Sequence, residues 1–271
     1  MKVLIKGAGD LATGIGCRLH RCGFDLVMTD IAVPTTVRRT VAFSRAVYEE
    51  KAKVEDVTGV LCNSLEEIHE AVAGDQVAVI VDEECRIRET WKPDVVVDAI
   101  IAKKNLGTLI TDAAVVVGVG PGFTAGIDCH VVVETKRGHN LGRCIWEGSA
   151  YPNTGVPGMI GGYDKERIIR ATADGVFRGQ VRIGDLVEKG DLVGYSGDSP
   201  IYAQVGGVVR GLLQDGVEVT KGMKSGDVDP RGIIESCYTI SDKASSIGGG
   251  VLEAILSMEK KRRREAPERE K

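Results

Sequence analysis

The sequence predicts an α/β fold, and two observations support this. A glycine-rich turn directly follows the first apolar strand, and further apolar, β-branched runs alternate with segments of helical periodicity. Such continuous runs are typical of strands in a parallel sheet covered on both faces. We therefore expect a Rossmann-like, doubly wound parallel sheet, followed by a small β-barrel and a closing helix.

The first turn has the pattern of a dinucleotide-binding motif. An apolar strand at 3–5 leads into Gly7, Gly9 and Ala12, which fit G-x-G-x-x-G/A. The first glycine permits a tight turn, the second lets a pyrophosphate approach the backbone, and the alanine lets helix pack on strand. The helix that follows, beginning near Asp10, would point its N–H groups and positive dipole end at an anion. We predict cofactor binding here.

The second strand predicts the ribose end of the same site. Residues 25–29 are apolar or β-forming and end at Asp30, about 20 residues past the glycines, where a ribose-binding acid is expected. The alternative is a scaffold whose glycine turn only packs tightly or binds another anion.

Further strands are predicted at 77–81, 95–97, 114–119 and 131–133, with a helix opened by a capping box at Ser64–Glu67. Ligands of open α/β sheets bind beyond the carboxyl ends of the strands. A second glycine-rich loop follows one of these ends, and its backbone N–H groups could form an anion-binding nest at Gly118, Gly120 and Gly122.

A polar cluster follows the strand at 131–133. We expect Glu134 or His139 to act as proton donor or base, and Arg137 and Arg143 to hold a phosphate, facing the crevice of the first glycine turn. The alternatives are an internal Glu134–Arg137 ion pair, or arginines that only brace the end of the sheet.

The remaining chain divides by composition. The Gly- and Pro-rich stretch 147–165 predicts a boundary between a nucleotide- or cofactor-binding domain at 1–165 and a small β-barrel at 166–238. Its repeated Lys-Gly turns resemble lipoyl- or biotinyl-carrier domains, but no lysine lies between Tyr202 and Val208, so we expect no covalent cofactor. Residues 239–260 predict a helix that packs back on the first domain, preceded by a flexible joint at Gly248–Gly250, and 261–271 form a charged tail.

Composition excludes several classes of protein. A formal net charge of −4 argues against a nucleic-acid binder. No apolar run is long enough for a membrane span, and the chain enters a strand without a signal peptide, so we expect a cytoplasmic location. The seven cysteines lack C-x-x-C spacing, which favours reduced thiols and predicts no metal site.

Several motifs, taken together, resemble the YqeB family of accessory proteins to selenium-dependent molybdenum hydroxylases. They are Lys6–Ala12, Arg38–Tyr48, Gly120–Gly126, Glu134–Arg143, Asn153–Gly158 and Asp227–Arg231. The resemblance covers about residues 2–258. It implies a role in the maturation of molybdenum enzymes of the xanthine-dehydrogenase type, with the hydroxylase or its cofactor-insertion machinery as partner. It supplies no catalytic residues.

Three functions follow as hypotheses. The first is a maturation factor that binds molybdenum cofactor or a nucleotide, whose phosphates suit a helix N-terminus. The second is an NAD-dependent oxidoreductase, with Asp30 on the ribose hydroxyls. The third is a non-enzymatic scaffold that docks the hydroxylase.

Overall fold

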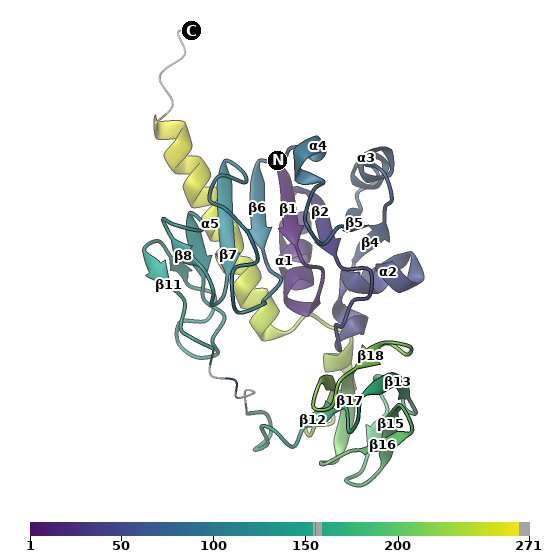
Figure 1. Ribbon diagram of the computed structural model, residues 1–271. Helices are drawn as coiled ribbons and strands as arrows, with labels where there is room; N and C mark the ends of the chain where they lie inside the picture. Colours follow the sequence, from purple (N-terminus) through teal and green to yellow (C-terminus); the bar gives the residue numbers. More distant parts are fainter. Residues whose placement is uncertain (154, 156–158, 266–271) are drawn as a thin grey trace.

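The computed structural model describes residues 1–153, 155 and 159–265. A nine-stranded sheet forms its larger part, in the order β10-β9-β7-β6-β1-β2-β5-β4-β3 (Figure 1). Neighbouring strands run parallel except at the two edges, where β3 and β10 are antiparallel to β4 and β9. The strands of this sheet are β1 (Lys2–Lys6), β2 (Asp25–Asp30), β3 (Lys51–Val54), β4 (Val57–Leu61), β5 (Val77–Val81), β6 (Val95–Asp98), β7 (Val115–Val119), β9 (Val131–Val133) and β10 (Cys144–Ile145). The short strands β8 (Thr124–Ala125) and β11 (Gly148–Ser149) pair separately.

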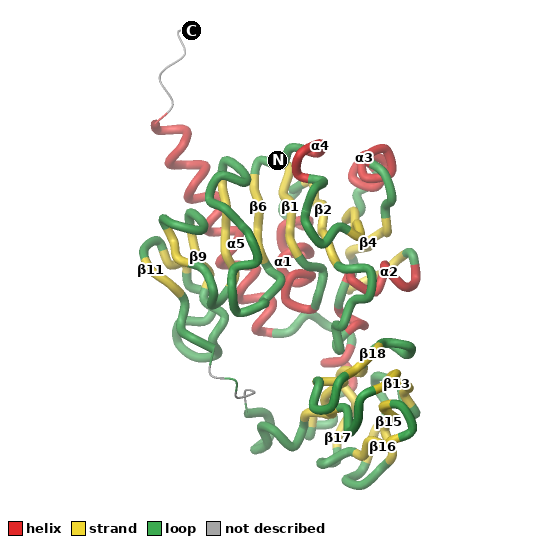
Figure 2. Tube along the Cα trace, in the orientation of Figure 1, coloured by secondary structure: helices red, strands yellow, loops and turns green. Residues whose placement is uncertain are grey.

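Helices cover both faces of the sheet. Successive strand residues point to opposite faces, so each face contributes side chains to its own hydrophobic core. Ile5 packs in one hydrophobic core with residues of α1 and α5, whereas Leu4 packs in another with Ile68 of α3 and Trp91 of α4. Figure 2 shows α1 and α5 behind the sheet. The α/β prediction is confirmed. The helices are α1 (Asp10–Arg21), α2 (Ala46–Glu49), α3 (Leu65–Ala73), α4 (Arg88–Trp91) and α5 (Asp242–Glu265), with short 3-10 turns η1 (Arg39–Val41), η2 (Phe43–Arg45) and η3 (Ile234–Cys237).

The predicted closing helix is confirmed, but the prediction of a flexible joint ahead of it is wrong. Gly248–Gly250 lie inside α5, not before it. Glycine is required there because the helix is pressed against its neighbours. A Cβ at Gly250 would lie 2.1 Å from the carbonyl oxygen of Gly142, and one at Gly248 would lie 3.1 Å from that of Gly14 in α1.

Residues 168–229 form two four-stranded antiparallel sheets, β12-β19-β17-β14 and β16-β15-β13-β18. We call this unit the sandwich. It has its own core, which includes Phe177, Val193 and Leu212. Its strands are β12 (Ile168–Arg170), β13 (Gly175–Gly179), β14 (Leu186–Val187), β15 (Leu192–Ser196), β16 (Ser199–Tyr202), β17 (Gly207–Leu212), β18 (Glu218–Val219) and β19 (Lys224–Asp229).

The segment between β2 and α2 joins the sandwich to the sheet. The backbone N–H of Leu212 donates to the carbonyl oxygen of Val37 at 2.8 Å, and Thr40 Oγ1 donates to that of Cys237 at 2.6 Å. Val37 and Tyr48 also pack against the sandwich core. In Figure 1 the sandwich lies beyond the carboxyl ends of the parallel strands, where ligands of such sheets bind.

Among the described residues, no helix is long and apolar enough to cross a membrane. Two features of the sequence fall partly outside the described residues: the motif at 153–158, of which 154 and 156–158 are not described, and the end of the charged tail, 266–271.

Two neighbouring glycines of α5 give a matched test of the packing. Gly250→Ala is expected to lower the free energy of unfolding by roughly 1–2 kcal/mol, because the clash with Gly142 outweighs the gain in helix propensity. Gly249→Ala, whose Cβ meets nothing within 4 Å, is expected to raise it by about 0.5–1 kcal/mol. Denaturant unfolding measures both. Equal effects of the two changes would contradict this packing of α5.

Candidate functional site

A crevice of about 830 Å³ opens at the carboxyl ends of β1, β2, β5 and β6. This volume lies within the range of about 300–1,000 Å³ that is typical of small-molecule sites. The residues that the first glycine motif predicts for cofactor binding all line it: Gly7, Gly9, Asp10, Ala12 and Asp30. We call it the turn crevice.

The turn between β1 and α1 requires its two glycines for different reasons. Gly7 has φ of +94°, and a Cβ there would lie 3.1 Å from the carbonyl oxygen of Ala99, so no other residue fits. Gly9 has an ordinary φ of −71°, and its Cβ would approach only Thr36 Oγ1, at 3.2 Å. The absence of a side chain at Gly9 therefore leaves space in the crevice rather than relieving backbone strain.

The N-terminus of α1 offers hydrogen-bond donors to that space. No described residue accepts a hydrogen bond from the backbone N–H of Asp10, Leu11 or Ala12, and Gly9, the N-cap, has no side chain to do so. These N–H groups and the positive end of the helix dipole together suit an anion.

Asp30 is held directly beside this turn. One carboxylate oxygen accepts from the backbone N–H of Ala8 at 3.0 Å, and the other accepts from that of Ile31 at 2.8 Å. Burial raises the pKa of Asp30 above its ordinary value, and these two hydrogen bonds oppose the rise. Each oxygen keeps acceptor capacity for a ligand hydroxyl, because a carboxylate oxygen can accept more than one hydrogen bond.

The far side of the turn crevice is acidic. Asp82, Glu83 and Glu84, which follow β5, line it together with Asp30. A ligand group at this end is therefore expected to be neutral or cationic, since a second phosphate would meet like charges.

Lys6, a lysine that lines the turn crevice, is a site residue that the sequence motifs did not identify. Lys6 is 5% exposed, and its Nζ lies 3.4 Å from Asp98 Oδ2 and 2.6 Å from Thr108 Oγ1. The signal available in the sequence was a lysine between an apolar strand and a glycine turn, at the carboxyl end of the strand, where ligands of such sheets bind.

Asp10 separates the turn crevice from a second cavity. Its carboxylate oxygens accept from Arg38 Nη1 at 2.9 and 3.1 Å. Arg38 in turn lines a cavity of about 440 Å³ between the sheet and the sandwich, together with Arg137, Arg210 and Arg231. We call this the arginine cavity. The Asp10–Arg38 pair therefore lies between the two cavities, with Asp10 on the side of the turn crevice and Arg38 on the side of the arginine cavity.

The cluster after β9 does not converge on the turn crevice. Arg137 lines the arginine cavity and binds Asp242 through two hydrogen bonds of 2.6 and 3.0 Å, so the alternative of a Glu134–Arg137 ion pair does not form either. Glu134 and Arg143 line a third cavity, of about 340 Å³. His139 is exposed and lines none of the three.

Glu134 instead holds backbone. Its carboxylate, 1% exposed, accepts from the N–H groups of Thr135 and Lys136 at 2.7 Å and of Tyr151 at 2.8 Å. This arrangement fixes the loop after β9 to the segment after β11.

The second glycine loop has a packing role in the structure. A Cβ at Gly118 would lie 2.6 Å from Phe123, one at Gly120 would lie 2.8 Å from Thr135 Oγ1, and one at Gly122 would lie 2.7 Å from the Lys104 backbone. None of these glycines lines the turn crevice.

The described part of the chain contains no cluster of metal ligands, and Cys17 of α1 is buried. No group of three or more His, Cys, Asp or Glu side chains is placed there to hold a metal ion. Burial raises the pKa of the Cys17 thiol in α1 to about 12, which leaves it protonated at neutral pH.

The chain is similar to one curated protein, the uncharacterized protein YqeB of Escherichia coli. The two are 48% identical over 256 residues, which is 94% of this chain and 47% of YqeB. This match supports the YqeB resemblance for the matched part, and the chain spans about half the length of that relative. No protein-family model matches the chain.

Solved structures resemble this chain only weakly. An aspartoacylase family protein from Mesorhizobium loti matches with 10% identity over 84% of each chain and a TM-score of 0.26. A succinylglutamate desuccinylase from a Silicibacter species matches with 13% identity over 84% of each chain and a TM-score of 0.25. Scores this low do not establish a shared fold.

The contacts of Glu134 predict a structural effect of its removal. Glu134→Ala is expected to lower the free energy of unfolding by about 3 kcal/mol, because three backbone N–H groups lose their acceptor. His139→Ala, at an exposed position of the same loop, is the control and is expected to change it by less than about 0.5 kcal/mol. Chemical denaturation measures both. A Glu134→Ala protein as stable as the control would show that these hydrogen bonds contribute nothing.

Proposed function

We propose that this chain binds the nucleotide part of a phosphate-bearing cofactor in the turn crevice of a Rossmann-like domain. One observation supports this above all others. The unpaired N–H groups at the start of α1 and the carboxylate of Asp30 face one crevice of about 830 Å³ from adjacent strand ends. This is the pairing of anion site and hydroxyl acceptor that a nucleotide needs.

The charges of the crevice orient the ligand. A phosphate or pyrophosphate lies against the backbone of Gly9 and the first turn of α1, and a ribose donates its hydroxyls to Asp30. Asp82, Glu83 and Glu84 beyond Asp30 disfavour further phosphates at that end. Lys6, which lines the crevice and pairs with the buried Asp98, is an ionisable group that a reaction could use.

We propose that the biological role of the protein is to assist the maturation of a selenium-dependent molybdenum hydroxylase. The motif resemblance implies this role, and a molybdenum cofactor with a nucleotide extension carries the pyrophosphate that the turn suits. The hydroxylase or its cofactor-insertion machinery would be the partner. The sandwich, which we take to be barrel-sandwich-like, would cover the cofactor without carrying one covalently, since residues 202–208 contain no lysine.

An NAD-dependent oxidoreductase is the second candidate, because Asp30 stands where such enzymes bind the ribose hydroxyls. It would need a proton donor other than Glu134 or His139, neither of which lines the crevice. A scaffold without a ligand is the third. Mass spectrometry of the small molecules retained on purification separates the three: pterin or nucleotide, NAD, or none.

Gly9→Val tests the turn crevice directly. The φ of −71° at Gly9 is open to any residue, so the fold is expected to survive while the new side chain fills the phosphate position. We expect affinity for the retained ligand, or for NAD⁺ and nucleoside diphosphates as probes, to fall at least ten-fold in calorimetry. Gly249→Val, on the far helix with open space around its Cβ, is the control. Unchanged affinity in Gly9→Val would refute the site.

The acidic end of the crevice predicts a preference among dinucleotides. NAD⁺ is expected to bind at least ten-fold more tightly than NADP⁺, because the 2′-phosphate of NADP⁺ would meet the carboxylates of Asp30 and Asp82. Competition calorimetry at fixed ionic strength measures the ratio. Equal affinities, or tighter binding of NADP⁺, would show that the ribose does not lie at Asp30.

A further inference from the structure

We propose that the arginine cavity is a second anion site, which takes the phosphate group of a small molecule. This inference is independent of the proposed function, because the cavity lies on the other side of the Asp10–Arg38 pair from the turn crevice. Its wall presents four guanidinium groups and one carboxylate, that of Asp242.

The acids that balance two of these arginines, Arg210 and Arg231, lie behind them. Asp227 and Asp229 of β19 are both 0% exposed and do not line the cavity. Arg210 contacts both, and Arg231 binds Asp229 through Nε at 2.9 Å and Nη2 at 2.7 Å. The buried carboxylates therefore hold the guanidinium groups in position while the cavity itself meets mainly positive charge.

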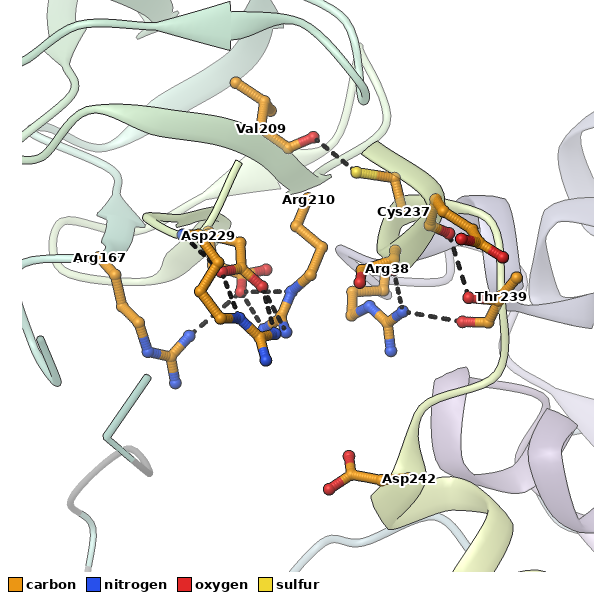
Figure 3. Close-up of polar contacts among 12 residues, drawn as sticks. Arg38, Arg167, Val209, Arg210, Asp229, Cys237, Thr239 and Asp242 are labelled. Atoms are coloured by element: carbon orange, nitrogen blue, oxygen red, sulfur yellow. Dashed lines mark hydrogen bonds and ion pairs between the residues drawn. The ribbon is translucent and has the colours of Figure 1, made fainter. Parts of the chain in front are cut away.

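The side chains come from distant parts of the chain and converge. Figure 3 shows Arg38 and Arg210 reaching toward one open space between the sandwich and the start of α5, with Asp242 on its other side. Arg167 also reaches this region and pairs with Asp227 at 3.1 Å. The cations come from β17, from the residues after β19 and from the segments after β2 and β9, and such convergence is costly unless opposite charge is close by.

Donor capacity remains on these groups. Arg38 is 6% exposed, its two terminal nitrogens are occupied by Asp10 and by the carbonyl oxygens of Ser236 and Thr239, and its Nε has no hydrogen-bond partner. Arg231 Nη1 and Arg137 Nε make no hydrogen bond to a described residue.

The electrostatics of neighbouring groups agree with a positive cavity. Burial lowers the pKa of Lys243, and the charge of Arg137 lowers it further. Burial alone would raise the pKa of Asp229, but hydrogen bonds from Arg231 and the charge of Arg210 bring it below its ordinary value.

A phosphate is the ligand that this geometry favours. Its oxygens accept several hydrogen bonds at once, and planar guanidinium groups bind them in pairs. Arg137 and Arg231, whose side chains are 42% and 48% exposed, give the ligand access from solvent.

The test measures binding of inorganic phosphate and pyrophosphate by calorimetry at constant ionic strength. The double variant Arg137→Ala/Arg231→Ala is expected to lose at least ten-fold in affinity at this site. Arg178→Ala, which removes an exposed, ion-paired arginine elsewhere on the sandwich, is the matched control and is expected to bind like the unmodified protein. The Gly9→Val variant is expected to keep this binding, which separates the arginine cavity from the turn crevice.

Arg137→Ala alone guards against a folding defect, because its ion-pair partner is the exposed Asp242. It is expected to weaken binding at least three-fold with an unchanged thermal midpoint. Absence of phosphate binding in the unmodified protein, or affinities in these variants equal to that of Arg178→Ala, would overturn the proposal. A phosphoserine peptide that binds more tightly than phosphate would overturn its assignment to a small molecule.

Discussion

The ion pair between Asp10 and Arg38 is the interaction on which both cavities depend. It ties the first residue of α1 to the segment that carries the sandwich, while Arg38 also donates to the carbonyl oxygens of Ser236 and Thr239 beside η3. The Arg38 side chain is buried, so loss of the Asp10 carboxylate would leave a guanidinium group in a poorly solvated place without its ion-pair partner, which is destabilising. This contact, together with the hydrogen bonds of Val37 and Thr40 to the sandwich side, fixes the wall between the two cavities.

The same pair changes what the start of α1 can bind. An aspartate in the first turn is favourable to the helix dipole, but its charge would also repel an anion arriving at the free N–H groups. Arg38 neutralises Asp10 from the side of the arginine cavity and leaves those N–H groups unoccupied. A glycine turn followed by an acid can in this way still serve an anionic ligand, which the sequence pattern alone does not explain.

Local patterns predicted local structure well. The Gly7–Ala12 turn, the place of Asp30 beside it and the Ser64 cap of α3, which accepts from the N–H of Glu67, depend on residues close in sequence or on the fixed geometry of a strand–helix–strand unit. The triple glycine and the cluster after β9 were not predictable, because their partners lie far along the chain. Arg137 pairs with Asp242, 105 residues away, and the glycines of α5 are set by the loop near Gly142. Hydrophobic periodicity is silent about such contacts.

Charge is sorted to opposite sides of the Asp10–Arg38 wall. The turn crevice has carboxylates at its far end, whereas the arginine cavity presents guanidinium groups whose acids are buried behind them. This sorting requires both parts of the chain. The carboxylates follow β2 and β5 of the sheet, whereas the cations come in equal number from loops of the sheet (Arg38 and Arg137) and from the sandwich side (Arg210 and Arg231). Neither part alone contains both sites. If both proposed sites bind, a ligand with one phosphate group and one hydroxyl-rich group fits the turn crevice in a single orientation. A further phosphate group is disfavoured by the carboxylates of the turn crevice and favoured by the guanidinium groups of the arginine cavity. The placement of the sandwich thus helps to determine which anions bind at the carboxyl ends of the parallel strands, besides covering these ends.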